Sequence, residues 1–262
     1  MIEFDAAINN LDPNLFRWIE SQTTDEDKGS LLAIQNATRT RRQPYRYLEI
    51  GSYLGGSIQP HLLDDHCERI YSIDKRPERQ PDARGFDWTY LNNSTGRMLE
   101  NLRQVGNDKI DKVITIDGGT EEISPESISE KVHLCLIDGE HTDEAMKRDF
   151  EFCRKVLDTD GGAIMFHDAQ ITYNGIYECI EDLKAENVGF RAFKLPSVLF
   201  VIEFGDFPLH RHPAIMARLI NNHEGYLFSL RENDRYRRFA NRYPFRAMRN
   251  IYARLRNANI SD

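Results

Sequence analysis

The hydrophobic positions of this 262-residue chain fall into short continuous runs separated by stretches of helical spacing. A continuous apolar run is typical of a central strand in a parallel sheet, because both of its faces are buried. Two runs, 190–195 and 198–204, are joined at Pro196-Ser197 and predict a pair of antiparallel strands. The other predicted strands are 45–50, 69–74, 112–116, 132–137 and 163–166.

Helical periodicity predicts most of the segments between these strands. Thr142 is suited to cap a helix, because Asp143 and Glu144 would follow it in the first turn. The Pro- and Arg-rich stretch 75–88 predicts a loop. The expected helices are 12–22, 25–40, 57–63, 93–105, 142–157 and 176–183.

Strands that alternate with helices indicate an α/β fold. We expect a Rossmann-like, seven-stranded and mostly parallel sheet with one antiparallel strand and helices on both faces. Helical extensions are expected at both termini. The predicted regions are an N-terminal helical cap at 1–44, the α/β domain at 45–204 and an Arg-rich helical extension at 205–262.

The composition is that of a soluble globular protein. No apolar run approaches the ~20 residues that a membrane span needs, and the early acids Glu3 and Asp5 argue against a secretory signal. The cysteines at 67, 135, 153 and 179 form no Cys-x-x-Cys pair, so we expect buried free thiols. These features predict a cytoplasmic protein.

Charge is unevenly distributed along the chain. The net charge is −8, but residues 231–262 carry +6 through nine arginines, which leaves −14 on residues 1–230. A basic amphipathic tail can contact a membrane surface or an anionic polymer, dock in a homo-oligomer, or pack on its own domain. The acidic body and the lack of a nucleic-acid motif argue against nucleic acid as a substrate.

The first predicted strand ends in the motif Glu49-x-Gly51-x-x-x-Gly55. Gly51 permits a sharp turn, and the glycines let the backbone approach a flat ligand closely. The spacing differs from the Gly-x-Gly-x-x-Gly of dinucleotide-binding folds. A carboxylate at this position suits a ligand with a cationic or hydroxylated part, although such a turn also occurs as plain α/β architecture.

Acids and histidines follow several of the predicted strands. Ligands of open α/β sheets bind beyond the carboxyl ends of the strands, so these side chains should share one rim. Asp74 is placed to accept hydrogen bonds from ribose hydroxyls, whereas Asp117 either reaches an adenine amino group or closes a turn. The rim residues are Glu49, Asp74, Asp117, Asp138, His141, His167 and Asp168.

Together these motifs resemble the class I S-adenosylmethionine-dependent methyltransferases. The turn Asp138-Gly139-Glu140-His141 and the pair His167-Asp168 resemble a subgroup of small O-methyltransferases, the methyltransferase domain 24 type. The resemblance covers about residues 45–204.

The resemblance implies S-adenosylmethionine as the cofactor. Glu49, Gly51 and Gly55 would hold its methionine part, Asp74 its ribose and Asp117 its adenine. A carboxylate-lined pocket favours the fixed positive charge of the sulfonium. The complete set of implied cofactor-binding residues is Glu49, Gly51, Ser52, Gly55, Asp74, Asp117 and Asp138.

For the acceptor side, the resemblance leaves three readings open. Asp138, His167 and Asp168 match the divalent-metal position of metal-dependent relatives, so they could hold Mg²⁺ or Mn²⁺. His167 replaces a carboxylate there, and imidazole suits Mn²⁺, Fe²⁺ or Zn²⁺ better than Mg²⁺. Alternatively, His141 or His167 is a general base without a metal, or His167 and Asp168 only cap a strand. The candidate catalytic residues are Asp138, His141 and His167.

The expected function is S-adenosylmethionine-dependent O-methylation of a hydroxyl on a small molecule, sugar or glycan. One alternative is a non-catalytic binding protein on the same fold. Another is a nicotinamide-dependent oxidoreductase, although the missing Gly-x-Gly-x-x-Gly after the first strand argues against it.

Overall fold

The computed structural model describes residues 3–83 and 87–220, together with residues 227, 231, 242–248, 250 and 251. Most of the predicted Arg-rich extension beyond Ile220 therefore lies outside the described residues. The four cysteines are buried free thiols, as expected. Among the helices of the described residues, none is both long enough and apolar enough to cross a membrane.

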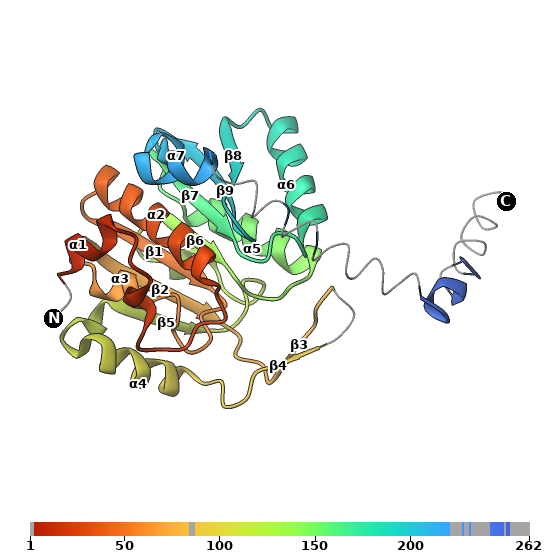
Figure 1. Ribbon diagram of the computed structural model, residues 1–262, viewed down its shortest axis with the longest axis horizontal. Helices are drawn as coiled ribbons and strands as arrows, with labels where there is room; N and C mark the ends of the chain where they lie inside the picture. Colours follow the sequence, from red (N-terminus) through yellow and green to blue (C-terminus); the bar gives the residue numbers. More distant parts are fainter. Residues whose placement is uncertain are drawn as a thin grey trace.

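The centre of the molecule is a seven-stranded sheet in the order β5-β2-β1-β6-β7-β9-β8 (Figure 1). The reversed strand is β9, which pairs antiparallel with both β7 and β8. This arrangement confirms the predicted Rossmann-like fold. The strands are β1 (Tyr45–Ile50), β2 (Cys67–Asp74), β5 (Val113–Asp117), β6 (Leu134–Ile137), β7 (Gly161–Phe166), β8 (Phe190–Lys194) and β9 (Phe200–Gly205).

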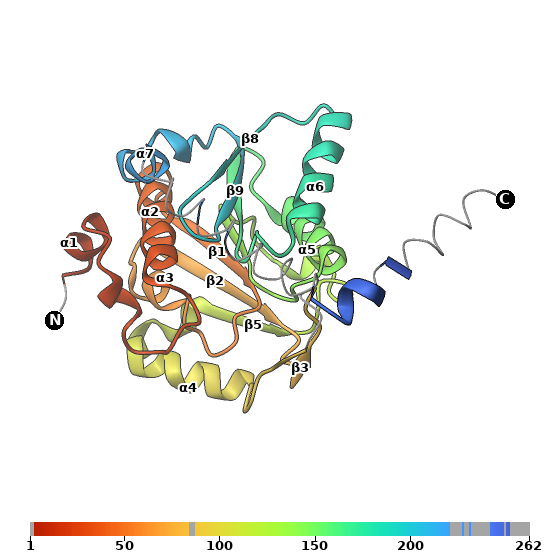
Figure 2. The same cartoon turned by 45° about the vertical axis from the view of Figure 1, so that its right-hand side comes forward.

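Helices cover both faces of the sheet (Figure 2). Side chains alternate along β1, so Tyr45 and Tyr47 pack under α2, α3, α4 and α7, whereas Leu48 and Ile50 pack under α5 and α6. Thr142 caps α5 by accepting from the Ala145 amide, as predicted. The helices are α1 (Phe4–Asn9), α2 (Asp25–Arg41), α3 (Gln59–Leu63), α4 (Thr95–Gly106), α5 (Asp143–Val156), α6 (Tyr173–Ala185) and α7 (Pro213–Ile220).

The helix predicted for 12–22 is wrong. Only Pro13–Phe16 form a short 3₁₀ helix, which Asp12 caps by accepting from the Asn14 amide. Beyond it, the Gln59 side chain accepts from the Trp18 and Ile19 amides at 3.0 Å each. These amides are satisfied by a distant side chain, so the segment does not need helical hydrogen bonds.

The loop predicted for 75–88 is also wrong in part, because it contains most of a small hairpin. β3 (Arg79–Gln80) pairs antiparallel with β4 (Trp88–Thr89), and the pair stands apart from the main sheet (Figure 1). Pro77 and Pro81 flank β3 without interrupting it, as proline can beside a strand.

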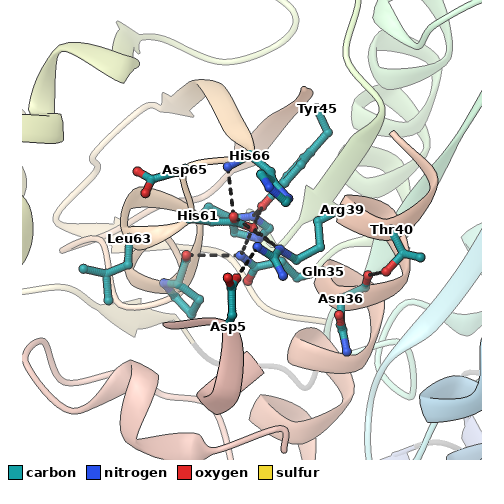
Figure 3. Close-up of polar contacts among 12 residues, drawn as sticks. Asp5, Gln35, Asn36, Arg39, Thr40, Tyr45, His61, Leu63, Asp65 and His66 are labelled. Carbon is teal, nitrogen blue, oxygen red and sulfur yellow. Dashed lines mark hydrogen bonds and ion pairs between the residues drawn. The ribbon is translucent and has the colours of Figure 1, made fainter. Parts of the chain in front are cut away.

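A buried polar cluster fixes α2 against the turn between α3 and β2 (Figure 3). The fully buried Asp64 carboxylate accepts from Gln35 at 3.2 Å, from Arg39 at 3.2 Å and from the Tyr45 hydroxyl at 3.1 Å. His61 lies 2.9 Å from the Tyr45 hydroxyl, and burial lowers the pKa of His61 to about 3. The cluster therefore fixes α2, whose N-terminus reaches the site described next.

Candidate active site

A cavity of about 510 Å³ lies at the carboxyl edge of the sheet. The ends of β1, β2, β6 and β7 contribute Gly51, Asp74, Asp138 and His167 to its lining. The remaining walls come from segment 20–27, from the β3–β4 hairpin and from the connection between β8 and β9. The cavity therefore lies at the rim where the sequence predicted the ligand.

Gly51 is required by the close approach of two strand ends. Its φ is +89°, and a Cβ atom there would lie 2.1 Å from the Asp138 carbonyl oxygen. Beside it, Ser52 lines the cavity and accepts a hydrogen bond from the Ser72 hydroxyl at 2.8 Å. Gly55 also has a positive φ, +88°, but it packs against Leu102 of α4 and does not line the cavity.

Glu49 lies behind the glycine turn and does not line the cavity. Because strand side chains alternate, it shares the face of Tyr47, whose hydroxyl donates to it at 2.7 Å. Ser57 donates to the other carboxylate oxygen. Burial raises the pKa of Glu49 to about 7, and these two hydrogen bonds only partly offset that rise. In this structure Glu49 stabilises the glycine turn through these hydrogen bonds, on the side away from the cavity.

The shifted pKa of Glu49 predicts a pH-dependent stability. The folded state binds the proton more tightly than the unfolded state, so this contribution is present below about pH 4.5 and is lost as the pH rises through about 7. Glu49→Gln should remove that loss. Between pH 5 and pH 8, the unfolding free energy of the variant should gain about 2.5 kcal/mol relative to the wild type, from 1.36 kcal/mol per pKa unit. Urea unfolding of both ligand-free proteins measures this; a difference independent of pH would show that Glu49 titrates normally.

Asp74 is held in position at the cavity wall. Its carboxylate is 7% exposed and accepts from the Tyr53 amide at 2.8 Å and from the Arg76 amide at 2.7 Å. The buried Arg76 side chain donates to the Tyr53 carbonyl and, at 2.7 Å, to the Thr95 hydroxyl. Arg76 thus joins the glycine turn to α4. Nothing in the sequence pattern distinguished it from the other arginines of 75–88.

Asp117 lies away from the cavity. Its side chain is 66% exposed, accepts from Thr95 and lies 3.6 Å from Arg76 Nε. A smaller cavity of about 30 Å³ beside the main one is lined instead by the next residues, Gly118–Thr120, and by Arg148. The geometry therefore gives no support to the adenine contact predicted for Asp117.

Asp138, His167 and Asp168 converge as the sequence predicted. His167 Nδ1 lies 3.1 Å from Asp138 Oδ1 and 3.3 Å from Asp168 Oδ2. The His167 side chain is only 8% exposed, and its Nδ1 is paired with the two carboxylates, whereas its Nε2 has no hydrogen-bond partner among the described residues. Burial opposes its protonation, but the two carboxylates outweigh burial and raise the pKa of His167 well above its usual value.

This trio fits a divalent metal ion. One potential ligand atom from each residue lies within 4.8 Å of the others. Two carboxylates and an imidazole suit Mn²⁺ or another first-row ion more closely than an all-oxygen site would. An ion bound here would replace the proton that the two carboxylates favour on His167.

His141 connects the trio to the β3–β4 hairpin. Its Nδ1 lies 3.0 Å from Asp82 Oδ2 and its Nε2 lies 3.3 Å from Asp168 Oδ2. Burial would lower the pKa of His141, but the Asp82 hydrogen bond and the Asp168 charge raise it overall. Asp82 lies in the stretch predicted as loop, so the sequence analysis missed it.

Comparison with known proteins identifies the fold. The family described as a methyltransferase domain matches residues 48–169. The O-methyltransferase NovP is 15% identical, with a TM-score of 0.55 over 74% of this chain and 87% of that one. CalS11, a TDP-rhamnose 3'-O-methyltransferase of calicheamicin biosynthesis, is 15% identical, with a TM-score of 0.50 over 79% of this chain and 96% of that one. At these identities the two structures bear on the fold alone.

Among curated proteins, the alanine–tRNA ligases of two Lactobacillus delbrueckii subsp. bulgaricus strains are 28% identical over 171 residues. The matched segment is 63% of this chain but only 17% of each ligase. The chain therefore corresponds to a small part of those proteins. The family match confirms the methyltransferase resemblance that the sequence motifs predicted.

Proposed function

We propose that the chain uses S-adenosylmethionine to methylate a hydroxyl of a small molecule or sugar, assisted by a divalent metal ion. The match of residues 48–169 to a methyltransferase domain supports the proposal. The convergence of Asp138, His167 and Asp168 in the cavity that Asp74 also lines carries this proposal.

The cofactor half of the cavity lies between the glycine turn and Asp74. S-adenosylmethionine, when bound, supplies a methyl group on a sulfonium cation. Asp74 would accept hydrogen bonds from its ribose hydroxyls, and the missing side chain at Gly51 leaves the backbone open to close approach. Positioning of the two reactants can account for much of the acceleration of such a displacement.

The acceptor half lies beside the trio. Asp138, His167 and Asp168 would hold a divalent ion, which when bound polarises an acceptor hydroxyl and lowers its pKa. His141 would take the hydroxyl proton at Nε2, the ring nitrogen that faces Asp168. Asp82, 3.0 Å from Nδ1, holds the imidazole ring in the orientation this needs.

A methyl-transfer assay tests the proposal directly. The protein would be incubated with methyl-tritiated S-adenosylmethionine and a mixture of glycosides and phenols, before and after dialysis against EDTA. Tritium should appear in alkali-stable ethers, disappear after dialysis and return with Mn²⁺ or Mg²⁺. Label found only in alkali-labile esters would contradict O-methylation of a hydroxyl, and unchanged activity after dialysis would contradict the metal.

Asp82→Asn is expected to lower kcat by about 10- to 100-fold, the usual effect of removing a carboxylate that orients a site histidine. KM for S-adenosylmethionine should stay the same, because Asp82 does not line the cavity. Steady-state kinetics measure both constants. Glu78→Gln makes the same chemical change at an exposed position of the hairpin and should be silent. Equal effects of the two variants would mean that the hairpin, not Asp82, matters.

A further inference from the structure

The acceptor side of the cavity has a wall built from segment 20–24. The fully buried Gln59 side chain holds the residues just before it, accepting from the Trp18 and Ile19 amides at 3.0 Å each. Its amide nitrogen donates to the Ile19 carbonyl at 2.9 Å and to the Gly56 carbonyl at 2.8 Å. One glutamine therefore attaches this segment to the end of the glycine turn, and the wall is held in place without an acceptor.

A second attachment completes the wall. Asp27, 1% exposed near the start of α2, accepts from the Val198 amide and the Ser197 hydroxyl, both at 3.2 Å. These residues lie between β8 and β9, so Asp27 joins two segments that are 170 positions apart. Asp27, Ser197 and Val198 all line the cavity.

Many of the residues that line this cavity have polar or acidic side chains. Among the described residues that line it, none is lysine or arginine. Hydroxyl and amide side chains dominate the acceptor side, where Ser21, Gln22, Thr23, Thr24 and Gln170 lie. Five lining residues carry carboxylates: Glu20, Asp27, Asp74, Asp138 and Asp168.

Three of these carboxylates already have roles in the proposed function, on the ribose and in the metal trio. Glu20 and Asp27 remain on the acceptor side. The pKa of His141, which also lines the cavity, is raised, but its two ring nitrogens face Asp82 and Asp168. The charges of Glu20 and Asp27 therefore act on the ligand, repelling groups of the same sign and attracting groups of the opposite sign. The wall therefore opposes phosphate or carboxylate groups and offers many partners to hydroxyl groups.

We infer that the acceptor is a polyhydroxylated molecule that is uncharged or carries an amino group, and that Glu20 and Asp27 exclude anionic sugars. This inference rests on the proposed function, and it narrows the acceptor to molecules without anionic groups.

The test compares four sets of acceptors under the tritium assay: neutral glycosides, 2-amino sugars, sugar 6-phosphates and catechols. The neutral and amino sets should show kcat/KM at least about tenfold above the phosphate set, as expected for a like charge held close to Glu20 and Asp27. Methylation of phosphates as good as that of the other sets, or of catechols alone, would overturn the inference.

Glu20→Lys supplies the matched variant, because Glu20 is exposed and its replacement leaves the core intact. It should raise kcat/KM for the phosphate set and lower it for the amino set, each several-fold. Glu100→Lys makes the same charge change at an exposed position of α4 that does not line the cavity, and it should change neither. Equal shifts in both variants would overturn the role of Glu20.

The same samples distinguish a failure of the proposed function from a failure of the inference about the acceptor. Calorimetric titration with S-adenosylhomocysteine reports cofactor binding without any acceptor. If the cofactor product binds and only phosphates are methylated, the proposed function stands and the inference fails. If it does not bind and no set is methylated, the proposed function fails first and the inference fails with it.

Discussion

Asp168→Asn is expected to reduce the rate of methyl transfer by at least about 100-fold, since a metal ion that polarises the acceptor contributes several kcal/mol. The substitution removes the charge that His141 and His167 both face, at 3.3 Å from each. Asparagine keeps the shape and tolerates the positive φ of 50° at this position, so the fold should survive. Methyl transfer under saturating S-adenosylmethionine measures the loss.

Two further readouts separate a metal role from a structural one. The variant should bind S-adenosylhomocysteine as the wild type does, but it should no longer remove free Mn²⁺ from solution in an electron paramagnetic resonance titration. Asp117→Asn is the matched control, because Asp117 also lies at the carboxyl edge of the sheet but lines neither cavity. Activity of Asp168→Asn within threefold of the control would refute the site.

Gly51→Ala should destabilise the folded chain by about 3 kcal/mol or more, because strain at a positive φ adds to a clash with backbone. The new Cβ would lie 2.1 Å from the Asp138 carbonyl oxygen, and neither strand end can move without disturbing the pairing of β1 with β6. Binding of S-adenosylhomocysteine should be lost with the geometry of the turn. Urea unfolding and calorimetry would measure the two effects.

Gly55→Ala provides the comparison within the same turn. Its φ of +88° is almost the same, but the atoms its Cβ would meet belong to the Leu102 and Met98 side chains, 3.1–3.2 Å away. Side chains can move where backbone cannot, so the cost should be about 1–2 kcal/mol, close to that of the φ strain alone. Equal losses at the two glycines would show that the contact with Asp138 is unimportant.

The sheet could be predicted because its signals are local. Each central strand is a continuous apolar run, and Thr142 with two acids after it marks the start of α5. The position of the site could be predicted as well, because the carboxyl ends of parallel strands share one edge of the sheet and ligands bind there. For that reason the sequence alone predicts that Asp138, His167 and Asp168 lie close together.

The features that the sequence did not predict depend on contacts between residues far apart in the chain. Asp82 and His141 are 59 positions apart, and Gln59 satisfies the Ile19 amide across 40 positions, so no window of sequence contains either pair. Glu49 is different, because strand alternation alone places it on the face of Tyr45 and Tyr47, below the sheet rim. The glycine motif predicted that Glu49 contacts the ligand. The alternation of side chains along β1 instead predicts that it faces the core with Tyr47.

Calorimetric titration of S-adenosylhomocysteine into the wild type and into Asp74→Asn examines the central claim with no acceptor and no metal. A ribose held by the Asp74 carboxylate predicts saturable binding to the wild type and an affinity about 10-fold or more lower in the variant, as for a lost charge-assisted hydrogen bond. The claim is contradicted if no heat of binding is measured, or if both proteins bind equally well.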